Sequence, residues 1–155
     1  MALQIGDQAP DFKLFNTNKK EVLLSDFSGK NLIIHFFPLA FTGTCTTQLC
    51  TMRDDMAFYS GLGAEVIGIS VDSLFTLEKY KAEQGLPFDL LSDFNKTVAP
   101  AYGAFYEHFV LNMNGVAKRS AFVVDKTGTI QYAEVLESAG DLPNFDAIKV
   151  VLTRL

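Results

Sequence analysis

The sequence lacks a long apolar segment. None of the apolar runs in this chain of 155 residues approaches the roughly 18 residues that a membrane-spanning helix needs. The longest run, residues 33–41, is interrupted by His35 and Pro38. The opening MALQIGDQAPDFKLF has no basic residue before Lys13 and no continuous apolar core. We therefore expect no secretory signal, no membrane segment and a cytoplasmic location.

Basic residues are also scarce. Thirteen Lys and Arg face eighteen Asp and Glu, which gives a formal net charge of −5 at pH 7. Such a chain repels phosphate backbones and anionic lipids, and no local Lys/Arg cluster offsets the repulsion. Nucleic acids and membrane surfaces are therefore excluded as expected partners. The apolar share of 48% and the charged share of 20% are typical of a globular protein.

Cysteine is the third scarce residue. The chain has two, Cys45 and Cys50, too few for a disulfide-rich secreted scaffold. In a reducing compartment a close cysteine pair is expected to be catalytic, redox-active or metal-binding. A metal site made of Cys45, Cys50 and His35 has weak support, because a single C-x4-C has no second ligand pair beside it.

The pattern of elements predicts one α/β domain over residues 1–155, without repeats or linkers. Buried strands are predicted at residues 31–37, 65–71 and 89–91, with helices at 44–59, 74–84, 96–102 and 142–155. Hairpins are predicted around the turn at residues 16–20 and over residues 119–136. This order implies a central mixed sheet with helices on both sides.

The loop at residues 38–45 leaves a predicted strand at its carboxyl end, where functional residues gather in such sheets. In the helix that follows, Cys45 opens a core-facing stripe that continues through Leu49, Met52, Met56 and Tyr59. Free N–H groups and the positive helix end favour an anion in the first turn. We expect a partly ionised Cys45 thiol near neutral pH. A core cysteine that merely continues the stripe is an equal alternative.

Cys50 lies five residues farther along the same predicted helix. In an intact helix the two Cα atoms are roughly 8–9 Å apart. A disulfide needs about 4.4–6.8 Å. Either Cys50 is inert, or the first helical turns unwind and its sulfur reaches Cys45, which makes it a resolving cysteine.

Ionisation of Cys45 is not sufficient for fast chemistry. It raises the reactive fraction by at most about thirtyfold at pH 7. A faster reaction needs groups that stabilise the charge developing on the substrate. Thr42, three residues before Cys45, can supply a hydroxyl. A fixed cation would contribute more, and Arg119 is one candidate that the sequence alone does not single out.

The motif Pro38-x-x-x-Thr42-x-x-Cys45 resembles the active-site signature of the peroxiredoxins. The segment RSAFVVD, which opens with Arg119, is similar to the arginine strand of that family. The resemblance covers nearly the whole chain, including GDQAPDF, FFP and the AYG at residues 101–103. The second cysteine, Cys50, five residues after the first, is similar to the cysteine spacing of the bacterioferritin-comigratory (PrxQ) group. The segments FFPLAFTGTC and LLSDF resemble the AhpE-like group more closely.

This resemblance implies a thioredoxin fold with an N-terminal β-hairpin extension, and a thiol-dependent peroxidase acting on hydrogen peroxide and organic hydroperoxides. Cys45 would attack the peroxide and become a sulfenic acid. Thr42 and Arg119 would bind and orient the reacting groups, and Pro38 would shield them from water. Neither a metal nor another cofactor is implied.

The resemblance also implies a recycling route. Cys50 would form an intramolecular disulfide with Cys45, which thioredoxin or a related dithiol protein would reduce. The alternatives are a one-cysteine peroxidase resolved by an external thiol, a general disulfide exchanger, and a redox sensor or binding module on the same fold. The expected assembly is a monomer or a homodimer.

Other positions near the motif carry finer expectations. Backbone amides near Thr44 and Cys45 would stabilise the leaving oxygen. Gln48 stands where most of the family has Glu, so it is a candidate to bind the substrate through hydrogen bonds but brings no charge. Phe41 is a candidate for an apolar collar around the substrate. His35 is expected to be a core residue of its strand whose polar atoms have hydrogen-bond partners.

Overall fold

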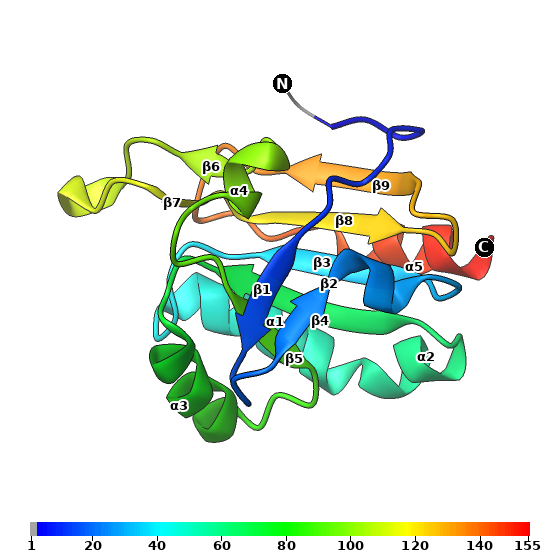
Figure 1. The fold of residues 1–155 in the computed structure, drawn as a ribbon, viewed down its shortest axis with the longest axis horizontal. Coiled ribbons are helices and arrows are strands. Elements are labelled where there is room, and N and C mark those ends of the chain that lie inside the picture. The colour runs from blue at the N-terminus through cyan, green and yellow to red at the C-terminus, as the bar shows by residue number, and fades with distance from the viewer. Residues whose placement is uncertain (1–2) are drawn as a thin grey trace.

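A seven-stranded mixed sheet organises the computed structural model, which describes residues 3–155 (Figure 1). The strand order is β2-β1-β5-β4-β3-β8-β9. Strands β3, β4 and β5 are parallel to one another, and the remaining pairings are antiparallel. The mixed sheet predicted from the element order is therefore confirmed. The strands are β1 (Lys13–Asn16), β2 (Glu21–Leu23), β3 (Leu32–Phe36), β4 (Glu65–Ser70), β5 (Asp89–Ser92), β8 (Ser120–Val124) and β9 (Ile130–Val135).

The N-terminal hairpin is formed by β1 and β2, as expected. The carboxamide oxygen of Asn16 closes its turn by accepting hydrogen bonds from the amides of Asn18 and Lys20, at 2.9 and 3.1 Å. Lys19 between them has a positive φ of 64°. Because β1 also pairs with β5, the hairpin extends the sheet at this edge.

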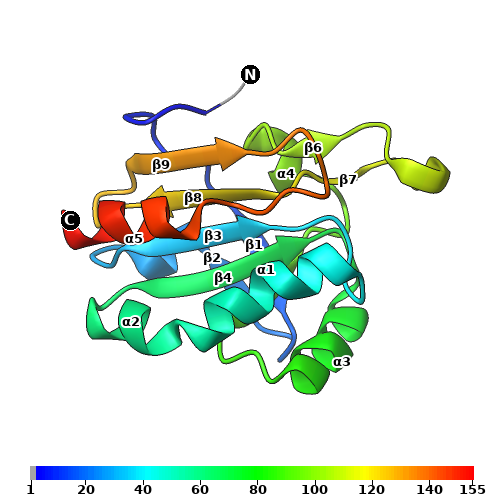
Figure 2. The same ribbon diagram turned by 180° about the vertical axis from the view of Figure 1, so that it is seen from behind.

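Residues 3–155 contain five α-helices and two 3-10 helices, and the last of them, α5, follows the final strand. Helices α1, α2 and α5 lie together on one face of the sheet (Figure 2), and α4 lies on the other (Figure 1). Within residues 3–155 none of the helices is long and apolar enough to cross a membrane. The helices are η1 (Leu24–Phe27), α1 (Gly43–Asp54), α2 (Met56–Gly61), α3 (Leu74–Gln84), α4 (Val98–Ala101), η2 (Val110–Asn112) and α5 (Phe145–Thr153).

The helix predicted at residues 44–59 is divided into two in the structure. Asp55 caps both pieces with φ −100° and ψ 8°, outside the helical region, so α1 ends before it and α2 begins after it. The final helix begins later than predicted, because the Asn144 side chain caps it by accepting from the Ala147 amide at 3.0 Å.

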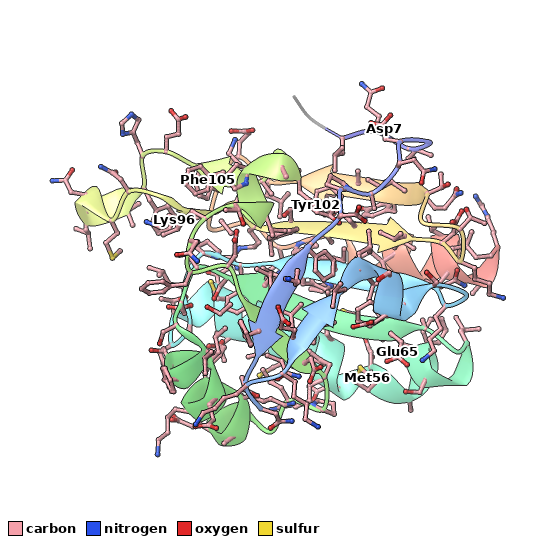
Figure 3. All side chains as sticks on the ribbon, viewed as in Figure 1. Asp7, Met56, Glu65, Lys96, Tyr102 and Phe105 are labelled. Carbon is pink, nitrogen blue, oxygen red and sulfur yellow. The ribbon has the colours of Figure 1, made fainter. Side chains whose placement is uncertain are left out.

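Alternate residues of β3 contribute to two cores. Ile33 and Phe37 pack with the helices α1, α3 and α5, whereas Ile34 and Phe36 pack on the opposite face. On that opposite face, the ring of Tyr102 (Figure 3) packs against that of Phe36 at a tilt of 48°. Its hydroxyl donates to the carbonyl of Pro10 at 2.7 Å, which fixes the N-terminal segment. By the same alternation, His35 faces α1 and α5.

A small two-stranded ribbon was not predicted from the sequence. It consists of β6 (Phe105–Tyr106) and β7 (Val116–Ala117) and carries the 3-10 helix η2 at its tip. Strands of two residues are too short to show an alternating pattern. Leu111 and Asn112 at the tip have positive φ values of 55° and 59°.

Candidate active site

Cys45 lies in the first turn of α1, directly after the loop that leaves β3. Thr42 precedes the helix as its N-cap, with extended dihedral angles. The side chain of Cys45 is almost fully buried, with 1% exposure, and begins the stripe that Leu49 and Met52 continue into the core. The first intrahelical bond of this end runs from the Thr46 amide to the Thr42 carbonyl, at 3.0 Å. The amides of residues 43–45 therefore have no partner inside the helix.

Arg119 is brought to Cys45 by the antiparallel pairing of β3 and β8. Ser120, the first residue of β8, pairs with Phe36, the last residue of β3, so the preceding Arg119 lies beside the loop after β3. Its Nη1 donates to the Sγ of Cys45 at 3.3 Å, across 74 positions of sequence. The arginine is 2% exposed. A nearly buried guanidinium is thus in direct contact with the sulfur.

The remaining contacts of Arg119 are to uncharged oxygens. Its Nε and Nη2 donate to the Ala139 carbonyl at 3.2 and 2.8 Å, and its Nη1 donates to Oε1 of Gln48 at 2.9 Å. Among residues 3–155 no Asp or Glu forms an ion pair with it. The guanidinium therefore contacts the Cys45 sulfur while no carboxylate neutralises its positive charge.

The loop between β3 and α1 is fixed by hydrogen bonds between side chains and backbone groups. The Ala40 amide donates to Oδ2 of Asp72 at 2.8 Å, and the Thr42 hydroxyl donates to the Leu39 carbonyl at 2.7 Å. Phe41 has a positive φ of 63°. A bulky residue in that conformation stores roughly 1–3 kcal/mol of strain. Pro38 at the start of the loop is buried.

A cavity of about 210 Å³ opens onto Cys45 and Arg119. Thr42 and Thr44 lie in its wall, together with apolar residues of the η2 region. Gln48 and Phe41 lie outside this lining. Gln48 is buried behind Arg119, and the ring of Phe41 packs 4.9 Å from that of Tyr80. The lining residues are Pro38, Leu39, Thr42, Gly43, Thr44, Cys45, Phe109, Val110, Met113, Arg119 and Ala139.

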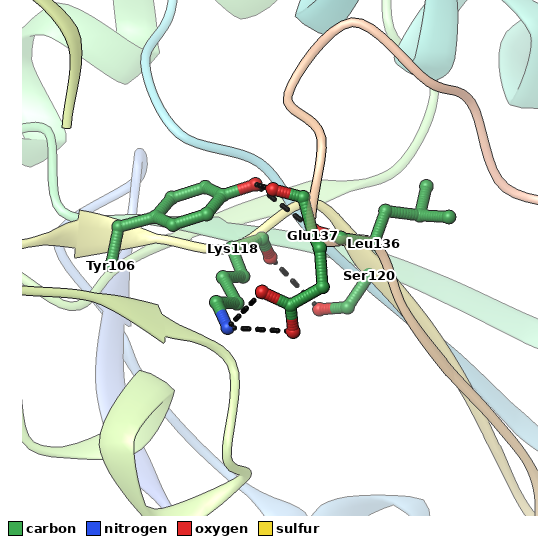
Figure 4. Close-up of polar contacts among 5 residues, drawn as sticks. All are labelled: Tyr106, Lys118, Ser120, Leu136 and Glu137. Carbon is green, nitrogen blue, oxygen red and sulfur yellow. Dashed lines mark hydrogen bonds and ion pairs between the residues drawn. The ribbon is translucent and has the colours of Figure 1, made fainter. Parts of the chain in front are cut away.

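The sequence did not indicate the segment at residues 136–139, which contacts Arg119 through the Ala139 carbonyl. The hydroxyl of Tyr106 donates to the carbonyls of Leu136 and Glu137 at 3.0 and 3.2 Å, and Lys118 pairs with the Glu137 carboxylate at 2.9 Å (Figure 4). Burial raises the pKa of Tyr106, so the hydroxyl keeps its proton for these bonds. This anchoring positions the Ala139 carbonyl against the guanidinium. The segment has no regular periodicity, so no sequence pattern indicated it.

Cys50 is half-buried on the side of α1 that faces the end of α3. Its Sγ contacts Oε1 of Gln84 at 3.6 Å, and Arg53 donates to the Gln84 carbonyl at 2.7 Å. Both cysteines are free thiols in this structure. The structure therefore shows an intact helix between them, with the second sulfur directed at a different element.

The first turn of α1 is also joined to α3. The hydroxyls of Thr46 and Tyr80 lie 2.7 Å apart. Burial raises the pKa of Tyr80 to about 12, so its hydroxyl is neutral at physiological pH. Within the described part of the chain, no group of three or more His, Cys, Asp or Glu side chains is placed to hold a metal ion.

His35 is a buried residue of its strand, as expected, and one of its ring nitrogens has a polar partner. Its Nδ1 lies 2.9 Å from Nε2 of Gln48, which also donates to the Phe36 carbonyl at 3.3 Å. Burial lowers the pKa of His35 to about 3, so the imidazole is neutral. The rarity of a histidine inside a buried apolar strand was the available signal.

Comparison with known proteins gives concordant results. Residues 5–133 match the model of the AhpC/TSA family. Alkyl hydroperoxide reductase E of Mycobacterium tuberculosis is 39% identical over 136 residues, covering 86% of each chain. Peroxiredoxin Bcp of Bacillus subtilis is 36% identical over 132 residues, covering 84% of this chain and 83% of that protein. The crystal structure of peroxidoxin BcpB from Mycobacterium tuberculosis superposes with a TM-score of 0.87 at 26% identity, covering 99% of this chain and 98% of the other.

Proposed function

Since the chain belongs to the AhpC/TSA family and is a peroxiredoxin of the Bcp (PrxQ) and AhpE-like type, we propose that it reduces hydroperoxides with Cys45 as the nucleophile. The observation that carries the proposal is the 3.3 Å contact between Arg119 Nη1 and Cys45 Sγ beneath a small cavity. A cation at this distance stabilises a thiolate, which is the reactive form of cysteine.

In the proposed reaction the Cys45 thiolate attacks the terminal oxygen of the peroxide. A new S–O bond forms while the O–O bond breaks, so sulfur is oxidised by two electrons to a sulfenic acid. The leaving oxygen departs as water or an alcohol after it takes up a proton. Thr42, Thr44 and Cys45 line this space. The amides of Thr44 and Cys45 can donate to the peroxide oxygens, whereas the Thr42 hydroxyl, whose hydrogen is directed at the Leu39 carbonyl, can accept a hydrogen bond from the peroxide.

Arg119 has one donor left for the substrate. A guanidinium carries five N–H groups, and four are directed at Ala139, Gln48 and Cys45. The fifth, on Nη2, is available to a peroxide oxygen. We propose that Arg119 binds thiolate and peroxide together, which holds the reacting atoms at close range.

The shape of the cavity supports the proposed substrate class. Buried Pro38 and the apolar side chains of Phe109, Val110 and Met113 form its non-polar wall. Such a wall accepts the alkyl group of a small organic hydroperoxide, while hydrogen peroxide needs only the polar end.

For recycling, we propose that Cys50 resolves the oxidised Cys45. Its thiol condenses with the sulfenic acid, a disulfide forms and water is released. Because the two residues are on one intact helix, the first turns of α1 must unwind first. Thioredoxin or a related dithiol protein then reduces the disulfide, which requires a reducing compartment such as the cytosol. Both cysteines are in one chain, so a monomer or a homodimer can follow this route.

The test adds hydrogen peroxide below stoichiometry and follows Cys45 by rapid quenching, alkylation and mass spectrometry. The parent chain should lose two hydrogens as the disulfide forms, whereas Cys50→Ser should stop at a Cys45 sulfenic acid. A Cys45 that reacts no faster than free cysteine would defeat the peroxidase proposal. Normal turnover of Cys50→Ser with thioredoxin would instead assign resolution to an external thiol.

A further inference from the structure

A buried chain of hydrogen bonds runs inward from the active site and ends at a histidine. Arg119 donates to Oε1 of Gln48, and Nε2 of Gln48 lies 2.9 Å from Nδ1 of His35. Gln48 is 0% exposed, His35 1% and Arg119 2%. The arginine that contacts the sulfur is thus connected to strand β3 through two uncharged side chains.

The hydrogen bonds fix how each group in this chain is oriented. The two hydrogens of the Gln48 amide are directed at His35 Nδ1 and at the Phe36 carbonyl, so its oxygen faces Arg119. A reversed amide would direct its oxygen at the Phe36 carbonyl, which can only accept, and its hydrogens at the Arg119 guanidinium, which can only donate. His35 must therefore accept at Nδ1 and carry its proton on Nε2.

The residues beside His35 in the sheet are small. The residues paired with His35 on the neighbouring strands are Ala121 in β8 and Gly68 in β4. A Cβ atom at Gly68 would approach Cδ2 of Leu90 to 2.8 Å, so this position takes no side chain without displacing its neighbours. The ring lies against Phe145 of α5, with centroids 6.0 Å apart.

Packing alone does not account for His35. Its Nε2 is buried and has no hydrogen-bond partner among residues 3–155. A buried unpaired N–H lowers stability, and an apolar side chain of similar size would avoid that cost. The nitrogen that does have a partner is the one that holds Gln48 beneath Arg119.

From these contacts we propose that His35 is a positioning residue that acts through Gln48 to hold the Arg119 guanidinium at Cys45 without neutralising its charge. A carboxylate beneath the arginine would share the positive charge, whereas an amide supplies an acceptor of defined direction and leaves the charge for the thiolate and the peroxide. The inference rests on the proposed function, since it concerns the same site.

Three substitutions of His35 separate positioning from packing. His35→Asn places Oδ1 at the same bond separation from the backbone as Nδ1 and keeps an acceptor for Gln48. His35→Gln is also polar and uncharged, but its oxygen lies one bond farther out, at the place of the unpaired Nε2. His35→Leu removes the acceptor and fills the space with an apolar group.

Each variant is compared with the parent in two reactions at pH 7. One is the second-order reaction of Cys45 with hydrogen peroxide, and the other is alkylation of Cys45 by iodoacetamide, which reports the thiolate without any peroxide. Loss of one neutral hydrogen bond corresponds to about three- to tenfold in rate. We expect that decrease in both reactions for His35→Leu and His35→Gln, and a rate within about twofold of the parent for His35→Asn. Melting temperatures are measured alongside.

Two results would overturn the inference. In the first, all three variants react like the parent. In the second, all three lose reactivity to the same extent and in step with their melting temperatures, which indicates packing. The two proposals can fail separately. If the parent reacts slowly with peroxide, the peroxidase proposal is rejected. If, in the same experiment, His35→Asn is still alkylated faster than His35→Leu and His35→Gln, the positioning role of His35 is supported.

Discussion

The hydroxyls of Thr46 and Tyr80 lie 2.7 Å apart and join the first turn of α1 to α3. The ring of Phe41, in the loop before α1, packs 4.9 Å from the Tyr80 ring. Both contacts hold the segment that must unwind before Cys50 can reach Cys45. Tyr80 therefore stabilises the reduced, helical form of the site and opposes the proposed disulfide.

Tyr80→Phe should speed the resolution step, because it removes the hydrogen bond to Thr46 and keeps the ring. A neutral hydrogen bond contributes about 1 kcal/mol, so we expect disulfide formation after peroxide treatment to accelerate about fivefold. The first oxidation of Cys45 should change little. Quenched-flow sampling with mass spectrometry follows both steps.

Tyr59→Phe is the matched control for this change. Tyr59 is equally buried, but its hydroxyl has no hydrogen-bond partner in the described part of the chain. Removing that hydroxyl should leave the resolution rate unaltered. Equal acceleration in both variants would show that Tyr80 does not restrain α1.

Arg119→Lys should lower the rate of Cys45 oxidation although the charge is kept. A lysine ammonium cannot reproduce the fork that reaches Ala139, Gln48 and Cys45 together. Charge-assisted hydrogen bonds contribute about 1.5–3 kcal/mol, so we expect a decrease of roughly tenfold to a hundredfold. The second-order rate constant with hydrogen peroxide measures it.

The control for that variant is Arg154→Lys, the same change at an exposed residue after α5. It should react like the parent. If Arg119→Lys also kept the parent rate, a positive charge alone would suffice and the directed hydrogen bonds would have no catalytic part.

Much of the fold could be predicted because it depends on local patterns. Buried strands at β3 and β4 have dense apolar runs, and Ser73 and Gly85 mark the ends of α3 through a capping hydroxyl and a left-handed residue. The stripe from Cys45 to Tyr59 identified the inward face of the helix. The break at Asp55 was missed, because the stripe continues across it.

The rest of the site depends on contacts between distant segments. The position of Arg119 follows from the register of β8 against β3, which no local pattern contains, and the motif resemblance alone indicated it. The Ala139 carbonyl and the side chains of Val110 and Met113 come from irregular segments. Predicting the hydrogen bond between Gln48 and His35 requires the packing of α1 against β3. The sequence around either residue does not indicate that packing.

Gln48→Glu should weaken the site in this chain. The new carboxylate would lie about where Oε1 now accepts from Arg119 at 2.9 Å, and it would compete with the Cys45 thiolate for the guanidinium. We expect alkylation of Cys45 at pH 7 to slow by about three- to tenfold. Gln4→Glu adds the same charge at an exposed position and should have no effect. Faster alkylation of Gln48→Glu would contradict the argument from charge.

Acid should destabilise the folded chain through His35. The pKa of this imidazole is lowered to about 3 by burial, whereas in the unfolded chain it is about 6.5. Between these values the unfolded state binds a proton that the folded state does not. Stability therefore rises with pH through this window and is lost as the pH falls. At pH 5 the loss relative to pH 7 should be about 2 kcal/mol.

Urea unfolding at several pH values measures this loss in the parent and in His35→Leu. Other groups titrate in both proteins, so the difference between the two curves isolates His35. That difference should change by about 2 kcal/mol between pH 7 and pH 5. His108→Leu, at an exposed position, is measured as the control for the loss of a histidine. Parallel curves for the parent and His35→Leu would mean that the imidazole takes up its proton without unfolding, and the neutral bond to Gln48 would then not be maintained by burial.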